Sequence, residues 1–418
     1  MMKYSVGFMV MLSVCKFAIA AYPEGVAAAN AGNFAKAISE WRPIADAGNA
    51  DAQASLAALY EDGRGVQKDE AEAAALYRRA ADQGNVNAQA KLGEFYELGR
   101  GVWKSDLFSV YWYRKAADQG NVKSQAMLGQ MYEQGRGVLK NYSTASEWYL
   151  KAAEQGNSNA QTGLGALLAD GRGVVQDLAQ AAAWFRKAAD QGNAAAQANL
   201  GALYASGLGV NKDLLQAADW SRKAAIQGHA GAQALLGVLY FNGDGVPKDL
   251  KQAMEWSNKS ATQGNSEAQA TLGLIYYRGA GLKQDLKLSA SWFRKAADQG
   301  HAQARSSLGL MYEKGEGVPQ SYPHALTLFR QAAEQGNPSA QFNLGAAYYS
   351  GTGVGRDVTL AYSLFNLAAA TGYDAAKKKR GELLEQLSNR EISEGQAISS
   401  LWKVGTPLPL STKTGRRY

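Results

Sequence analysis

The glycines of this chain recur with a fixed period of 36 residues. One series runs in these steps from Gly63 to Gly351, and a second runs from Gly65 to Gly353. The pattern gives nine consecutive units without an insertion or deletion. A period of this length predicts a repeat architecture in which each unit packs mainly on its neighbours.

Each unit contains two helical stretches, which we term helix A and helix B, separated by these glycines. Residues 87–98 place Ala88, Leu92 and Phe95 on one face of a helix and end at Gly99. Glycine can adopt the left-handed conformation that closes a helix. Two short amphipathic helices per period cannot bury their apolar faces alone, so the units are expected to stack.

Residues 178–191 of the fourth unit are an example of helix B, which is expected to end at Gly192. Helix A contains a glycine, Gly93 in the second unit, that costs about 1 kcal/mol relative to alanine. This recurring cost predicts close approach of a neighbouring helix. A tryptophan register on helix B is interpreted as core between repeats rather than as a cofactor site; its members are Trp112, Trp148, Trp184, Trp220, Trp256 and Trp292.

The repeated pattern resembles a known family. Ala-Gln-x-x-Leu-Gly-x-x-Tyr, Gly-x-Gly-Val and Ala-x-x-Trp-x-x-x-Ala-Ala-x-Gln-Gly, over residues 50–373, are similar to the Sel-like repeats, relatives of tetratricopeptide repeats. The resemblance implies an all-α fold, a right-handed superhelix (solenoid) of nine two-helix repeats with a concave surface for protein partners. It implies no catalytic residues. Ala57, Leu168 and Arg305 depart from the pattern.

The two ends of the repeat array are expected to be capped, because a solenoid needs polar terminal elements. Residues 21–49 resemble a half repeat and are expected to form an N-terminal helical cap. Residues 374–402 are expected to form two C-terminal capping helices. Residues 403–418 contain proline, glycine and threonine and are expected to be a disordered tail.

The first twenty residues have the features of a secretory signal peptide. Lys3 precedes an apolar stretch, and Ala18, Ile19 and Ala20 form a cleavage pattern before Ala21. We therefore expect residues 1–20 to be removed and the protein to be periplasmic or secreted, as in exported bacterial members of the family. A lipoprotein signal ending at Cys15 is the alternative. No other segment is apolar enough to span a membrane.

The charge and motif content excludes several classes of function. The ends of the chain contribute six of the seven net positive charges, so the repeats carry no basic stripe for nucleic acid. No metal-ligand spacing and no Gly-Lys phosphate loop occurs, so no cofactor or metal is expected. His229 and His301 occupy the register of Asn193, where helix capping is expected.

One motif coincidence concerns penicillin-interacting serine enzymes. Ser400 and Lys403 match Ser-x-x-Lys, and residues 413–415 match Lys-Thr-Gly. The third motif, Ser-Asp-Asn, is absent, and the two matches lie only ten residues apart in the tail. These motifs therefore carry little weight.

The helix A face opposite the core varies along the chain. It is acidic in early units, as at Glu97 and Glu133, and becomes apolar and aromatic later. We interpret the later part as a partner-binding strip on the concave surface; its residues are Val238, Phe241, Leu274, Tyr277, Leu310 and Tyr349. Packing against the C-terminal helices or against a second copy of the chain are the alternatives.

Together these observations predict an exported, non-catalytic scaffold that binds a protein or peptide on its concave helix A face. A host-directed virulence factor is one alternative. An envelope enzyme that acts on glycan or penicillin is another, although only the expected compartment favours it.

Overall fold

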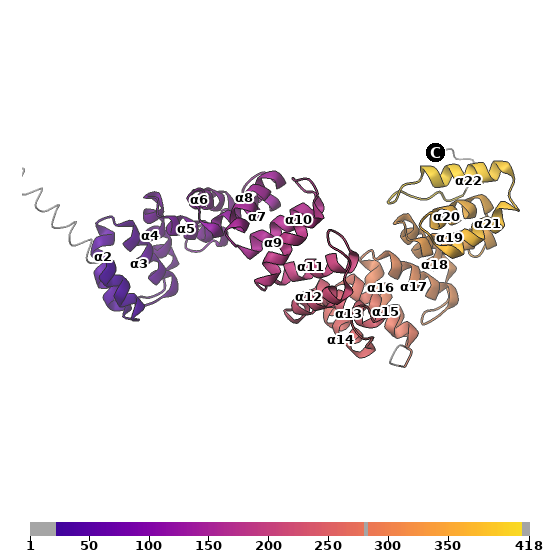
Figure 1. The fold of residues 1–418 in the computed structure, drawn as a ribbon, viewed down its shortest axis with the longest axis horizontal. Helices are drawn as coiled ribbons and strands as arrows, with labels where there is room; N and C mark the ends of the chain where they lie inside the picture. The colour runs from indigo at the N-terminus through magenta and orange to yellow at the C-terminus, as the bar shows by residue number, and fades with distance from the viewer. Residues whose placement is uncertain (1–21, 280–282, 412–418) are drawn as a thin grey trace, which may run out of the picture. The chain divides into compact units, whose positions relative to one another are not determined.

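The computed structural model describes residues 22–279 and 283–411 (Figure 1). Within these residues the chain forms helices joined by short turns and loops, with no strand. None of the helices in this part of the chain has the length and apolar character needed to cross a membrane. The predicted all-α solenoid of two-helix repeats is therefore confirmed.

The nine repeats consist of 13-residue helices in strict alternation. The A helices are α3 (Ala50–Asp62), α5 (Val86–Leu98), α7 (Val122–Gln134), α9 (Ser158–Asp170), α11 (Ala194–Ser206), α13 (Ala230–Asn242), α15 (Ser266–Arg278), α17 (Ala302–Lys314) and α19 (Pro338–Ser350). The B helices are α4 (Glu70–Asp82), α6 (Asp106–Asp118), α8 (Tyr142–Glu154), α10 (Leu178–Asp190), α12 (Leu214–Ile226), α14 (Leu250–Thr262), α16 (Leu286–Asp298), α18 (Tyr322–Glu334) and α20 (Val358–Ala370).

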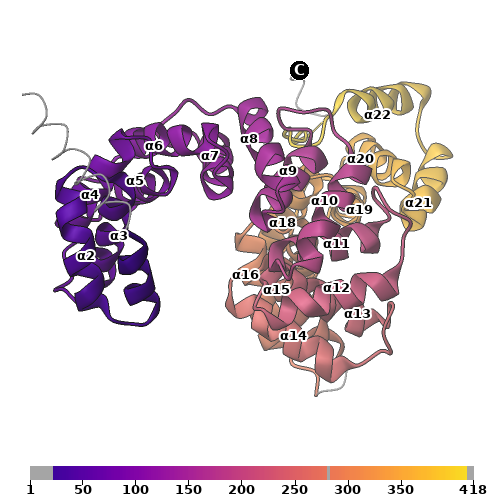
Figure 2. The ribbon, with the colours of Figure 1, turned by 60° about the vertical axis from the view of Figure 1, so that its left-hand side comes forward.

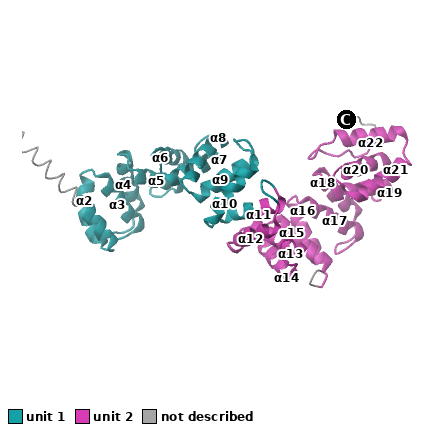
Figure 3. Cartoon of the chain, in the orientation of Figure 1, with its two compact units in different colours: residues 1–200, 208–211 teal, residues 201–207, 212–418 magenta. Residues whose placement is uncertain are grey.

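The chain divides into two compact units (Figure 3). The first unit runs to Leu200 and includes residues 208–211, and the second contains residues 201–207 and the chain from Lys212 onward. Each unit is an array of helix pairs in which helix A packs on helix B of the same repeat, as α3 does on α4 and α13 on α14.

Capping side chains begin the A helices at the positions that the sequence indicates. Asn85 Oδ1 accepts a hydrogen bond from the backbone N–H of Ala88 at 2.9 Å. His229 and His301 act in the same way. Their Nδ1 atoms accept hydrogen bonds from the backbone N–H groups of Ala232 and Ala304, at 3.3 and 3.1 Å. These histidines therefore satisfy helix N-termini.

A glycine in helix A lets helix B of the same repeat approach closely. A Cβ atom at Gly129 would lie 2.4 Å from Cδ1 of Tyr149, a distance that no side chain tolerates. The expected reason for the costly helical glycine is thereby confirmed. The same contact between a helix A glycine and an aromatic ring of helix B occurs at Gly93 and Tyr113, Gly165 and Phe185, Gly273 and Phe293, Gly309 and Phe329, and Gly345 and Phe365.

A second glycine joins consecutive repeats. Gly101 has φ of 61°, and a Cβ there would lie 1.9 Å from the carbonyl oxygen of Glu70, at the start of the preceding B helix. The same contact with the backbone of the preceding B helix recurs at Gly137, Gly173, Gly209, Gly245 and Gly317.

A buried glutamine in eight of the nine A helices bonds a backbone carbonyl of the preceding helix. Gln125 is 5% exposed; its Nε2 donates to the carbonyl of Ala117 in the preceding repeat at 3.2 Å, and its Oε1 accepts from Gln155 Nε2 at 2.7 Å. In the eighth repeat Arg305 replaces this residue, and its Nε donates to Ala297 O at 3.0 Å. The bond to the carbonyl recurs at Gln53, Gln89, Gln161, Gln197, Gln233, Gln269 and Gln341.

The tryptophan register is only partly core. Trp112, Trp148 and Trp220 are buried, whereas Trp184 and Trp256, like Trp292, are half-buried. Each ring has the ammonium group of the lysine three residues later at 4.0 to 5.1 Å from a ring centroid. The half-buried rings are thus covered in part by lysine side chains, in cation–π geometry.

Helices close both ends of the array. Residues 22–30 are helical and precede α2 (Phe34–Asp46), where the buried Trp41 donates from Nε1 to Tyr22 O at 3.1 Å. After the last repeat come α21 (Asp374–Leu384) and α22 (Asn389–Leu401), and α22 lies beside α20 (Figure 2).

The expectation of a disordered tail from residue 403 is wrong for residues 403–411, which we term the tail strap. Gly405 N–H donates to Glu334 O at 2.7 Å, and Leu408 is 4% exposed. The strap is ordered because α18 and α19 satisfy its peptide groups and bury its leucine. Residues 412–418 lie outside the described residues.

Replacing Gly129 by alanine tests the close approach of helix A and helix B. The added methyl group overlaps the ring of Tyr149, so we expect Gly129→Ala to lower the free energy of unfolding by about 1–3 kcal/mol. Chemical denaturation followed by circular dichroism measures this change.

The control is Gly381→Ala in α21, where a Cβ meets no atom within 4 Å. This variant should be neutral or more stable by up to about 1 kcal/mol. Equal effects of the two substitutions would contradict the packing account.

Candidate functional site

The six residues of the predicted strip lie on successive A helices of the second unit, from α13 to α19. Five of them are half-buried, and Phe241 is only 7% exposed. Phe241 packs in an apolar cluster with Leu272 and Ile275 of α15. The expectation that Phe241 is an open anchor is therefore wrong, because α13 and α15 pack directly on each other and cover it.

Two tyrosines of the strip make polar contacts with other parts of the chain. Tyr277 donates from its hydroxyl to Glu316 Oε2 at 2.8 Å, and this bond, together with burial, raises the pKa of Tyr277. Tyr349 donates to Gln386 Oε1 at 3.3 Å, and Lys379 of α21 lies 5.8 Å from its ring centroid. The last member of the strip thus contacts the C-terminal cap.

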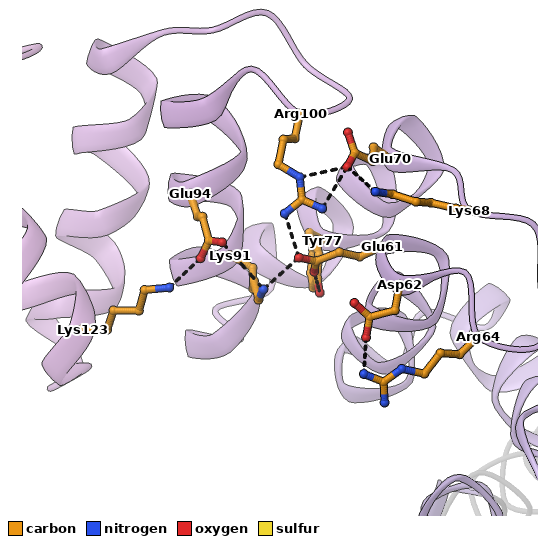
Figure 4. A network of polar contacts seen from close by, with 10 residues as sticks. All are labelled: Glu61, Asp62, Arg64, Lys68, Glu70, Tyr77, Lys91, Glu94, Arg100 and Lys123. Carbon is orange, nitrogen blue, oxygen red and sulfur yellow. Dashed lines mark hydrogen bonds and ion pairs between the residues drawn. The ribbon is translucent and has the colours of Figure 1, made fainter. Parts of the chain in front are cut away.

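In the first unit the same register carries glutamates that bridge repeats. Glu61 is 8% exposed and accepts hydrogen bonds from Tyr77 at 2.7 Å, Lys91 at 2.9 Å and Arg100 at 3.0 Å (Figure 4). Burial alone would raise the pKa of Glu61, but the hydrogen bonds from these three residues outweigh it and lower the pKa. Arg100 also pairs with Glu70 at 3.0 Å.

This glutamate–tyrosine–arginine arrangement recurs at the next two junctions. Glu97 accepts from Tyr113 at 2.9 Å and pairs with Arg136 of the following repeat at 3.0 Å. Glu133 accepts from Tyr149 at 2.9 Å and lies 3.6 Å from Arg172. The acidic face noted in the sequence is therefore a partly buried contact between repeats.

The residues of this arrangement change together along the chain. Where the glutamate is replaced by Ala169, the tyrosine position holds Phe185 and the arginine position holds Leu208. Glu313 keeps the carboxyl but has Thr352 in place of the arginine, and burial raises the pKa of Glu313. The three positions thus change together from the third to the fourth repeat, whereas the eighth repeat keeps the carboxyl without its arginine.

Sequence reasoning missed the most exposed apolar side chains of the repeats. Trp103, Leu139 and Val175 are 93%, 91% and 87% exposed and occupy one register in three consecutive loops of the first unit. We term these residues the loop row. The same register holds Gln67 and Asn211 in the flanking repeats. The spacing of 36 residues was the signal that could have revealed the row.

Helix α6 extends the apolar surface beside the loop row. Leu107, Phe108 and Tyr111 are 65%, 50% and 49% exposed, although they belong to a helix of the repeat core. Phe108 also contacts Tyr96, with ring centroids 5.2 Å apart. The second repeat therefore presents exposed apolar groups from both its loop and its B helix.

The polar groups weighed for catalysis or metal binding do not form a complete site within the described residues. They hold no group of His, Cys, Asp and Glu suited to a metal ion. Ser400 donates to Ala397 O at 3.1 Å, and Lys413 lies outside the described residues. Ser321 Oγ lies 2.7 Å from His324 Nδ1 within the first turn of α18, but no carboxylate in the described ranges orients this imidazole.

Comparison with known proteins identifies the repeat. The Sel1 repeat model matches nine consecutive segments from residues 50–85 to residues 338–373. A comparison with curated proteins finds no significant match.

Two solved structures are similar over most of the chain. A protective antigen present in uropathogenic Escherichia coli strains, with an SLR fold, is 36% identical with a TM-score of 0.80, over 92% of this chain and 84% of that one. A Sel1 repeat protein from Oxalobacter formigenes is 35% identical with a TM-score of 0.52, over 72% of this chain and 88% of that one. This chain therefore belongs to the Sel1 repeat family.

Proposed function

We propose that this chain is an exported, non-catalytic scaffold that binds a partner protein, with the loop row as its principal contact surface. Sel1 repeat proteins are generally scaffolds for protein interaction. The observation that carries the proposal is the near-complete exposure of Trp103, Leu139 and Val175 in one register. Large apolar groups left in water mark contact sites, and tryptophan is among the strongest interface anchors.

The loops that carry the row are fixed before any partner binds. Gly101 and Gly137, which precede two members of the row, rest on the backbone of the preceding B helix. Little conformational entropy is then lost by the scaffold on association. Burial of the exposed side chains contributes about 25 cal/mol per Å² of apolar area.

The helix A strip is a second candidate contact surface. Val238, Leu274 and Leu310 are half-buried and remain partly accessible on three successive A helices. Phe241 contributes to the packing of α13 on α15 and is not part of this proposal.

The proposed compartment rests on residues 1–20, which lie outside the described residues. Their charged start, apolar stretch and Ala-Ile-Ala cleavage pattern support a periplasmic or secreted protein. The similar Escherichia coli structure is a protective antigen, and this supports a host-directed role as the second candidate function.

Site-specific photo-crosslinking tests the contact surface. We expect p-benzoylphenylalanine in place of Trp103 or Leu139 to give covalent adducts with one partner in cells that produce the full chain. The matched controls place it at Gln67 or Asn211, which are exposed in the same loop register. Mass spectrometry of the adducts identifies the partner and the site.

Adducts of equal yield from all four positions would contradict the loop row. A further probe at Leu274, compared with Gln130 in the same helix register, separates the two candidate surfaces. Adducts only from Leu274 would assign binding to the helix A strip.

Cleavage of the signal peptide is tested on the protein purified from the periplasm or the medium. We expect N-terminal sequencing to begin at Ala21, and we expect Ala20→Arg to block processing because the cleavage site requires a small residue. A mature chain that retains Met1, or one that begins with a lipidated Cys15, would contradict the proposal.

A further inference from the structure

The tail strap shows how this scaffold holds an extended peptide. Arg330 of α18 donates from NH1 to the carbonyl oxygens of Leu408 at 2.9 Å and Pro409 at 3.3 Å. Tyr348 of α19 donates from its hydroxyl to Leu410 O at 2.9 Å. All three bonds go to backbone carbonyl oxygens of the Pro-Leu-Pro-Leu segment at residues 407–410, and none goes to a side chain.

An acid completes the set that holds the strap. Glu334 Oε1 accepts from the N–H of Leu408 at 3.0 Å, and Leu408 is buried in the cluster formed by the last repeats. One arginine, one acid and one tyrosine thus satisfy consecutive peptide groups around a single buried leucine.

The same three residue types stand 36 positions earlier, where they line an open cavity of about 350 Å³. They are Arg294 and Asp298 of α16 and Tyr312 of α17. The other lining residues are Leu308, Pro323, His324, Thr327, Leu328 and Gln331. We term this cavity the α16–α18 groove.

The wall of this groove is open, whereas the equivalent wall one repeat later is covered. Thr359, Leu360, Ser363 and Leu364 of α20 are each 5% exposed or less. Their equivalents on α18, Pro323, His324 and Thr327, are exposed, and Leu328 is half-buried. Helix α22 packs on α20 and covers this surface in the ninth repeat, whereas the equivalent surface of α18 is open.

The hydrogen-bonding state of the groove also matches that of the occupied site. Arg294 NH2 donates to the hydroxyl of Tyr312 at 2.9 Å, as Arg330 donates to Tyr348 at 2.7 Å. A phenolic hydroxyl that accepts one bond keeps its own hydrogen for a carbonyl oxygen. Tyr312 is therefore prepared to donate to a peptide, as Tyr348 does.

We infer that the α16–α18 groove binds an extended, proline-containing segment of a partner protein, in the manner of the tail strap. Proline lacks an N–H group and favours the extended conformation, so a segment rich in it pays little conformational entropy on binding. The rings of Tyr312 and His324 are stacked with centroids 5.1 Å apart and form an aromatic wall. Aromatic-lined grooves are the usual recognition surface for such segments.

This inference is independent of the loop row, which belongs to the first unit. It adds a surface of stated chemistry in the second unit, lined by residues of α16, α17 and α18.

A labelled synthetic peptide with the sequence of residues 403–411 tests the inference. We expect saturable binding to the full chain by fluorescence anisotropy, with one peptide per chain. Tyr312→Phe should weaken binding about three- to tenfold, because one hydrogen bond to the peptide is lost. A peptide in which aspartate replaces Leu408 should not bind.

The matched control is Tyr240→Phe. Arg222 donates to Tyr240 at 3.0 Å, but Ile226 stands where the groove has Asp298. This variant should bind as the wild type does, and circular dichroism checks that both variants keep their helices.

Two results would overturn the inference. One is the absence of saturable binding at millimolar peptide. The other is binding that survives Tyr312→Phe but is lost in Tyr348→Phe, which would place the peptide in the strap's own site. Light scattering tests whether a second copy of the chain occupies the groove. Self-association that is abolished by Tyr312→Phe would show that the bound segment comes from another molecule of this chain and not from a partner protein.

Discussion

Eight of the nine repeats are joined to the helix before them by a buried glutamine whose amide nitrogen bonds a backbone carbonyl of that helix, and Arg305 makes this bond in the eighth repeat. Gln125 bonds a carbonyl of the preceding B helix through its nitrogen and Gln155 of its own repeat through its oxygen. A buried amide that loses a partner is costly, so the helices that supply its partners must keep their positions. This constraint accounts for a period of 36 residues without insertion or deletion.

The glycines allow close packing both within a repeat and between repeats. Gly129 admits the ring of Tyr149 from its own repeat, and Gly101 admits the backbone at Glu70 of the preceding repeat. With helices this close, a side chain on the outer face of helix A also meets the next repeat. The variation along that face from Glu61 to Tyr277 therefore follows the partner that the next repeat offers, Arg100 in one case and Glu316 in the other.

Local structure could be predicted from this sequence, and contacts between distant segments could not. The second helix A was expected at residues 87–98 and is observed at Val86–Leu98. This prediction was close because the residues that begin and end the helix, Asn85 and Gly99, directly flank it in the sequence. The burial of Phe241 depends on residues of α15. The pattern of apolar residues along α13 alone does not show this contact. The order of the tail strap depends on Arg330 and Glu334, which lie far from it in sequence, and its composition gave no sign of them. The shared register of the loop row, in contrast, can be found from the spacing of 36 residues, although its exposure is known only from the structure.

The most direct test of the account replaces the residues of the junction at Glu97 by those that stand at the same positions two repeats later. Glu97→Ala alone leaves Tyr113 and Arg136 without their shared partner and should lower the free energy of unfolding by about 1–3 kcal/mol. Arg136 also pairs with Asp106 at 2.8 Å, so this acid must be replaced with it. The fourfold variant Glu97→Ala, Tyr113→Phe, Arg136→Leu, Asp106→Leu reproduces the natural set Ala169, Phe185, Leu208 and Leu178. The account predicts that the fourfold variant recovers most of the lost stability in chemical denaturation. Losses that add over the four substitutions would contradict the claim that this register is set by pairing between repeats.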